Sequence, residues 1–174
     1  NDRKIKEDIF ISKKHFNKAK TNQKVVVKIL KQPKDGRKAE GEIIEVLGNI
    51  NKFGVDLMCM VKEYNLPFEF PEFVLEEANK MPDTVKDTEL KNRVDLRNKM
   101  IFTIDGEDAK DLDDAICVEK NKEGNYILSV HIADVSHYVK ENSNLDNEAI
   151  ARGTSVYMLN TVIPMLPEKL SNGI

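Results

Sequence analysis

The chain has 174 residues, of which 40% are hydrophobic and 33% are charged, and its formal net charge is −3. This length suits one domain or two small ones, and the hydrophobic fraction is enough for a packed core. No apolar run approaches the length of a membrane span, and no apolar signal segment follows the charged start, so neither a membrane protein nor a secreted one is indicated.

Positive charge is concentrated at the start of the chain. Residues 1–40 contain 13 Lys and Arg against 5 Asp and Glu, a net of +8, whereas the remainder has a net of −11. A basic segment attracts phosphates, and an acidic segment needs cations before phosphates can approach it. The pattern therefore suits an enzyme that acts on a polyanion. A merely solvated lysine-rich surface is the alternative.

The first part of the chain has the pattern of a small β-barrel. Strands are expected over residues Ile9 to Ile11, Val25 to Leu30 and Glu42 to Val46, which are rich in Ile and Val. The polar segment Gln32 to Lys38 separates the last two and contains the turn-forming residues proline and glycine. Short strands with basic connections are typical of barrels that bind nucleic acid.

Helical spacing follows the strands. Apolar residues recur at helical intervals from Val55 to Tyr64, and a second helix is expected from about Pro71, as a first-turn proline, to Lys80. The segment Thr84 to Arg97 is polar, so it is expected to be a connector that can contain one helical turn.

The last third of the chain predicts alternating strands and one helix. Met100 to Ile104 is apolar and partly β-branched, so a buried strand ending at Asp105 is expected there. Further strands are expected over Ala115 to Val118, Tyr126 to Ile132 and Thr154 to Leu159. A short helix is expected over Leu145 to Arg152.

The most informative feature is an acidic loop between the first two of these strands. Six acids and one lysine occupy the ten positions from Asp105 to Asp114. Like charges at this density repel unless solvent or a cation neutralises them. The loop lets Asp105 face Asp111, Asp113 and Asp114. Carboxylate oxygens are hard ligands that suit Mg²⁺ or Mn²⁺, and such ions often act on phosphate esters.

Two alternatives to a catalytic metal site must be weighed. A calcium-binding EF-hand loop needs glycine at its sixth position and glutamate at its twelfth, where this chain has Lys110 and Ile116. The second alternative is an acid-rich loop that is simply solvated. The spacing of the acids does not exclude it, because aspartate is common in turns for its own local hydrogen bonds.

Four sequence blocks carry a family resemblance. They are I-D-G-E-D-A-K-D-L-D-D-A from Ile104, V-H-I-A-D-V-S-H-Y-V from Val130, R-G-T-S-V-Y from Arg152 and I-P-M-L-P from Ile163. In this order they resemble the start of the catalytic domain of the ribonuclease II/R family, and its bacterial ribonuclease R branch in particular. One block alone would be a weak signal, whereas all of them in the same order are specific.

The resemblance implies a processive, hydrolytic 3′-to-5′ exoribonuclease that releases nucleoside 5′-monophosphates with Mg²⁺, for which Mn²⁺ could substitute. The metal-binding catalytic aspartates of the family map by motif onto Asp105, Asp111, Asp113 and Asp114. An aromatic residue that packs against the 3′-terminal nucleotide of single-stranded RNA maps onto Tyr157. From the residues alone, Tyr157 could instead be an ordinary core residue of a strand.

The histidines near these blocks receive no functional role from the resemblance. His131 and His137, like Asp134 between them, lie in the block that starts at Val130. No role carries over to any of them by motif. Structural hydrogen bonding is therefore expected of all three.

The start of the chain resembles the second cold-shock, OB-type domain that precedes the catalytic domain in the same family. The matching segments are D-I-F-I from Asp8, K-V-V-V from Lys24 and G-E-I-I-E-V-L-G from Gly41. The expected fold class is mixed α and β. It comprises an OB-type, cold-shock-like barrel over residues 1–48, a helical linker over 49–97 and an incomplete α+β catalytic domain over 98–174.

The chain is expected to be a fragment of such an enzyme. The family's first cold-shock domain, its later catalytic arginine and glutamate, and its C-terminal OB domain have no counterpart here. The predicted function is thus part of a 3′-to-5′ exoribonuclease that is inactive by itself, and the alternative is a non-catalytic module that binds single-stranded RNA. The chain has two cysteines, Cys59 and Cys117, which lack C-x-x-C spacing, so neither a zinc site nor a disulfide framework is predicted. A location in the reducing cytoplasm is expected.

Overall fold

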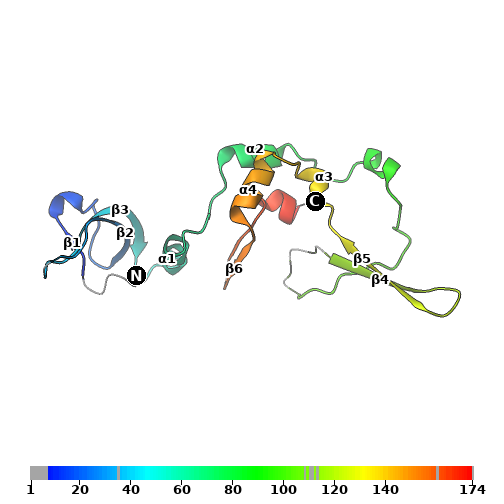
Figure 1. Cartoon of the computed structure of the whole chain (residues 1–174), viewed down its shortest axis with the longest axis horizontal. Coiled ribbons are helices and arrows are strands. Elements are labelled where there is room, and N and C mark those ends of the chain that lie inside the picture. The colour runs from blue at the N-terminus through cyan, green and yellow to red at the C-terminus, as the bar shows by residue number, and fades with distance from the viewer. Residues whose placement is uncertain are drawn as a thin grey trace. The chain divides into compact units, whose positions relative to one another are not determined.

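The computed structural model describes residues 8–34, 36–107, 109, 112, 114–159 and 161–173. The chain divides into two compact units, residues 1–68 (unit 1) and residues 69–174 (unit 2). Helices and strands both occur, so the predicted mixed α and β class is confirmed (Figure 1). The predicted division after residues 48 and 97 stays a prediction. None of the helices in the described ranges has the length and apolar character of a membrane span.

Unit 1 is built on a three-stranded sheet with β3 in the middle. Its elements are β1 (Phe10–Ile11), the 3-10 helix η1 (Lys13–His15), β2 (Gln23–Lys31), β3 (Glu40–Asn49) and α1 (Val55–Glu63). β1 pairs with β3 in parallel and β2 pairs with β3 in antiparallel orientation. The three predicted strands and the first predicted helix are therefore confirmed.

A glycine is required where the three strands meet. A Cβ atom on Gly41 would lie 2.6 Å from Cγ1 of Val27, which is too close for carbon atoms, and 3.1 Å from Cγ2 of Ile9, which is tight. Because β3 has a neighbour on each side at this point, a larger residue would force these side chains to move.

Unit 2 contains a pair of helices that pack together, a long β-hairpin and a short β-hairpin. Its elements are α2 (Glu72–Asn79), the 3-10 helix η2 (Asp87–Asn92), β4 (Asp114–Lys120), β5 (Tyr126–Ile132), α3 (Val135–Tyr138), α4 (Asn144–Arg152), β6 (Val156–Met158), β7 (Thr161–Ile163) and α5 (Glu168–Ser171). β4 pairs with β5, and β6 with β7, both in antiparallel orientation. The second predicted helix, the predicted helix at α4 and the predicted strands at β4, β5 and β6 are confirmed, although Pro71 caps α2 instead of opening its first turn.

The core of unit 2 lies between α2, α4 and α5, which cluster in Figure 1. Val74 and Ala78 of α2 and Leu145 of α4 are fully buried there. The hydroxyl of Ser143 accepts a hydrogen bond from the Asp146 amide at 3.1 Å, which caps the start of α4. The Glu77 carboxylate accepts another from the Asn144 amide at 3.0 Å, so α2 and α4 are joined by polar as well as apolar contacts.

At the other end of α4, the side chain of Arg152 is almost completely buried. It donates to Glu148 at 2.8 Å, to the Pro164 carbonyl at 3.1 Å and to the Glu69 carbonyl at 2.8 Å. Its guanidinium carbon lies 3.5 Å from the centre of the Phe70 ring. The segment before α2, the helix α4 and the segment after β7 are therefore joined at one guanidinium.

The predicted buried strand from Met100 to Ile104 is wrong in its extent and its burial. Only Phe102 pairs, through one isolated bridge to Ile116. Met100 and Ile104 are 82% and 80% exposed. A strand is buried only where other elements cover its faces, and no described segment covers these side chains.

Arg152→Ala tests the role of the buried guanidinium. Because the change leaves Glu148 half-buried without its partner and frees two carbonyls, we expect the free energy of unfolding to fall by about 3–5 kcal/mol. Denaturant unfolding of the chain measures this. Arg97→Ala is the control, since the partner that the described residues give to the exposed Arg97 is Asp95, two residues away. It should change the value by no more than about 0.5 kcal/mol. Equal effects of the two variants would contradict the assignment.

Candidate functional site

The acidic loop is closed at its base by backbone hydrogen bonds. The Phe102 amide donates to the Ile116 carbonyl at 3.1 Å, and the Ile116 amide donates to the Phe102 carbonyl at 2.9 Å. An ion pair between Lys99 and Glu119 holds the preceding segment to β4 as well. The two ends of the loop are thereby brought to the same edge of β4.

Asp105 and Asp114 stand at these two ends. Asp105 follows Phe102 by three residues, Asp114 precedes Ile116 by two, and both are exposed. Their carboxylates are thus available to a ligand. Asp111 and Asp113, the other two predicted metal ligands, lie outside the described residues.

The donor set fits a hard divalent cation in its chemistry. Asp105 and Asp114 offer carboxylate oxygens, which Mg²⁺ and Mn²⁺ prefer over nitrogen or sulfur. Within the described ranges, no group of three or more His, Cys, Asp or Glu residues is placed to hold a metal ion. The described residues include two of the four positions predicted as ligands, and their binding of a metal stays a prediction.

The hairpin continues the site on the other side of β4. Asp114 is paired with Ile132, the last residue of β5, and Ile116 is paired with Val130. The strand that begins with Asp114 thus lies between the Phe102 segment and β5. The position of Asp114 depends on both of these neighbours.

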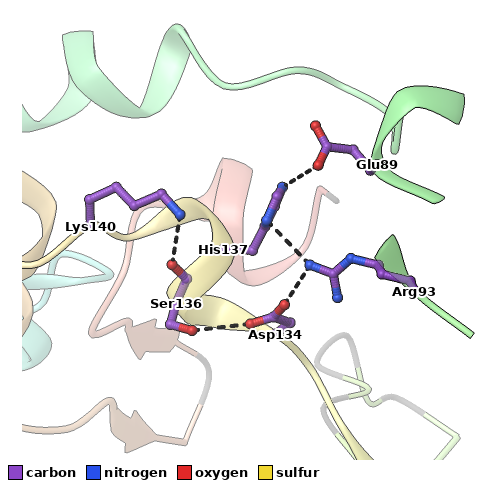
Figure 2. Close-up of polar contacts among 6 residues, drawn as sticks. All are labelled: Glu89, Arg93, Asp134, Ser136, His137 and Lys140. Carbon is purple, nitrogen blue, oxygen red and sulfur yellow. Dashed lines mark hydrogen bonds and ion pairs between the residues drawn. The ribbon is translucent and has the colours of Figure 1, made fainter. Parts of the chain in front are cut away.

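A polar network follows directly after β5 (Figure 2). Nη2 of Arg93, just after η2, lies 2.6 Å from Oδ2 of Asp134 and 3.3 Å from Nδ1 of His137. Nε2 of His137 lies 3.1 Å from a carboxylate oxygen of Glu89, in η2. A neutral His137 with its proton on Nε2 satisfies both contacts, because Nδ1 then accepts from Arg93 and Nε2 donates to Glu89.

Asp134 is the centre of this network. Its second oxygen accepts from the Ser136 hydroxyl at 3.1 Å. The hydrogen bond from Arg93, and then the one from Ser136, lowers the pKa of the Asp134 carboxyl below its ordinary value of 3.8. The stabilisation from this pairing is therefore present above that pH and is lost as the pH falls through the lowered pKa.

The expected structural hydrogen bonding is confirmed for Asp134 and His137. His131 differs, because its Nε2 is buried without a hydrogen-bond partner in the part of the chain that the structure describes. The network also lines a cavity of about 310 Å³ together with apolar side chains, among them Val135 and Leu170.

Tyr157 lies in β6, paired with Val162 of β7. Its side chain is 69% exposed, so it is not a core residue of the described structure. An exposed aromatic ring on a short hairpin is available for stacking. Its predicted contact with RNA stays a prediction.

Unit 1 offers a separate candidate surface. A groove of about 590 Å³ is lined by Phe16, Lys20 and residues of all three strands. Phe16 is 42% exposed. Lys13, Lys14 and Lys20 nearby in the chain have no ion pair with any residue that the structure describes. The groove thus combines an aromatic side chain with one lining lysine, Lys20, and two further lysines lie near it in the chain.

Two arginines of unit 2 were not anticipated as important. Arg152 is the first residue of the motif R-G-T-S-V-Y, but nothing in the sequence indicates that its guanidinium is buried. Arg93 reaches Asp134 across 41 residues of chain. A polar contact over that separation has no periodic pattern from which it could have been inferred.

Comparison with protein-family models gives two matches. The RNB domain matches residues 93–174, and a cold shock domain matches residues 1–71. Among curated proteins, ribonuclease R of Thermotoga maritima is 54% identical over 175 residues, which covers 99% of this chain and 25% of that protein. The chain therefore spans about a quarter of the length of this relative.

Solved structures give the same result. Mycoplasma genitalium RNase R, in complex with double-stranded RNA, matches with a TM-score of 0.82 at 32% identity, over 95% of this chain and 29% of that one. Yeast Ssd1, described as a pseudonuclease, matches with a TM-score of 0.70 at 21% identity, over 99% of this chain and 23% of that one. The second likeness concerns the fold alone.

Proposed function

The chain belongs to the ribonuclease II/R family, and on that premise we propose that it forms the metal-binding and part of the RNA-binding surface of a 3′-to-5′ exoribonuclease. The proposed reaction is hydrolysis of single-stranded RNA from its 3′ end, with release of nucleoside 5′-monophosphates. We also infer a cytoplasmic location, which the free cysteines Cys59 and Cys117 support.

The observation that carries this proposal is the closed base of the acidic loop. The mutual hydrogen bonds of Phe102 and Ile116 bring the segments bearing Asp105 and Asp114 side by side. Exposed carboxylates on neighbouring segments are available to a cation, and a cation bound by both would neutralise their charge. The same bridge would also close a solvated loop, so the family relationship is what favours a bound cation.

Each group has a proposed task. Asp105, Asp111, Asp113 and Asp114 hold Mg²⁺ or Mn²⁺. A divalent cation at such a site supplies an activated water and neutralises charge at the leaving 3′ oxygen. Tyr157 stacks on the 3′-terminal nucleotide, and the exposed lysines of unit 1 attract RNA phosphates. Stacking and charge are insensitive to base identity, as degradation of any sequence requires.

A non-catalytic RNA-binding module is the second candidate. The groove beside Phe16 and the net charge of +8 over residues 1–40 support binding without any use of the acidic loop. The yeast pseudonuclease has the same fold, so the fold by itself does not imply hydrolysis. The two candidates differ in whether carboxylate ligands are needed.

Asp114→Asn separates the candidates. In the full-length protein we expect the variant to bind Mn²⁺ at least tenfold more weakly and to lose hydrolysis, because one anionic ligand is gone. Mononucleotide release from 3′-labelled RNA measures the second effect, and RNA affinity should be unchanged.

Glu123→Gln is the matched control, since Glu123 lies in the turn at the opposite end of the same hairpin. It should behave as wild type. Full hydrolysis by Asp114→Asn would reject the catalytic proposal and favour the binding module.

Tyr157→Ala tests the stacking role. Because Tyr157 is exposed, its loss should leave the thermal midpoint nearly unchanged. The hold on the last nucleotides should weaken by about 1–3 kcal/mol, so the shortest undegraded RNA should change in length. Tyr126→Ala is the control, because Tyr126 is also a strand tyrosine, 72% exposed. An end product identical to wild type would remove Tyr157 from the site.

The groove of unit 1 generates a salt-dependent prediction. If lysines of residues 1–40 attract phosphates, the affinity of the chain for single-stranded RNA should fall steeply between about 50 and 200 mM salt, with little sequence preference. The logarithm of the affinity falls linearly with the logarithm of the salt concentration. Replacing Lys13, Lys14 and Lys20 together by Gln should make this slope less steep by about two to three units. A slope unchanged by these replacements would place RNA elsewhere.

A further inference from the structure

Two side chains of the η2 connector contact the turn that follows β5 (Figure 2). Arg93 lies 2.6 Å from Asp134, and Glu89 lies 3.1 Å from His137. Glu89 and Arg93 are four residues apart in one segment, and their partners begin and end the first turn of α3. The connector is thus joined to this turn at two points.

The same turn directly follows β5, which pairs with β4, the strand that begins at Asp114. β5 ends at Ile132, only two residues before Asp134, and Ile132 is the pairing partner of Asp114. A shift of Asp134 would move the end of β5, and with it the backbone that is hydrogen-bonded next to Asp114. The contacts of Asp134 therefore bear on the position of a carboxylate outside the network.

The Asp134 carboxylate is fixed on both oxygens. Arg93 donates to one, and Ser136 donates to the other at 3.1 Å. The Lys140 ammonium group donates to the Ser136 carbonyl at 3.1 Å, which holds the turn itself. A carboxylate bound in this way has few alternative orientations, so it can transmit the position of Arg93 to the strand end.

We propose that Arg93 is a positioning residue for the metal-binding aspartates, and that it acts by holding Asp134 and so the end of β5 opposite Asp114. This inference rests on the proposed function, in which Asp114 is a metal ligand. In this role Arg93 acts through Asp134 and not as a ligand of the cation. Mg²⁺ demands nearly ideal octahedral geometry, so a small displacement of one ligand lowers affinity. Loss of groups that orient metal ligands typically costs 10–100-fold in affinity.

The neighbouring Arg97 provides a matched control. It also forms an ion pair with an aspartate, Asp95, at 2.7 Å. That partner is two residues away in the same segment, so the pair joins no separate elements. Removing Arg97 takes away the same charge and the same side chain without releasing β5.

The test is Mn²⁺ binding by the full-length protein without RNA. The electron paramagnetic resonance signal of free Mn²⁺ measures how much of the ion is bound. We expect Arg93→Ala and Asp134→Asn each to weaken binding about tenfold. The double variant should be no weaker than either single one, because both changes remove the same ion pair. Arg97→Ala should bind as wild type. Arg93→Lys should recover much of the affinity, since an ammonium group can still donate to Asp134.

The outcomes distinguish this inference from the proposed function. If folded Arg93→Ala and Asp134→Asn bind Mn²⁺ as tightly as wild type while Asp114→Asn does not, the positioning role is rejected and the metal site stands. An equal loss in Arg97→Ala would also reject it, as a general effect of charge. If Arg93→Ala does not fold, Asp134→Asn, which keeps the side-chain shape, decides. Unchanged binding in Asp114→Asn would overturn the proposed function and this inference together.

Discussion

The buried guanidinium of Arg152 is the constraint on which unit 2 depends. Only 1% of its side chain is exposed, and it joins α4 to the carbonyls of Glu69 and Pro164 while lying against Phe70. A buried cation is costly unless its donors are satisfied, so these partners must stay in place together. β6 begins four residues after Arg152, so the same contact holds the chain that leads into the strand bearing Tyr157.

The acidic loop depends on weaker and more exposed contacts. The side chains of Arg93 and Asp134 are 44% and 47% exposed, so solvent screens their attraction and little stability is expected from it. Its importance is geometric, because it lies next to the end of β5. Unit 2 thus uses one buried arginine for cohesion and one exposed arginine for placement. Stability and metal affinity should therefore respond to different substitutions.

The sequence predicted the elements whose signals are local. Apolar and polar residues alternate clearly from Tyr126 to Ile132, and the predicted bounds of this strand agree with those of β5. The acidic loop stands out in the sequence because six acids occur within ten positions. Shorter elements such as β7 and α5 were missed, because three or four residues are too few to show a period. Met100 to Ile104 was predicted as buried because an apolar run does not reveal whether anything covers it. The contacts of Arg93 and Arg152 depend on the tertiary fold, which no local pattern encodes.

The most direct test of the central claim is anomalous X-ray scattering from crystals of the full-length protein soaked with Mn²⁺. A manganese peak about 2 Å from carboxylate oxygens of both Asp105 and Asp114 is expected. Manganese bound only elsewhere, or none at a concentration that supports hydrolysis, would contradict the assignment of the closed acidic loop as the metal site.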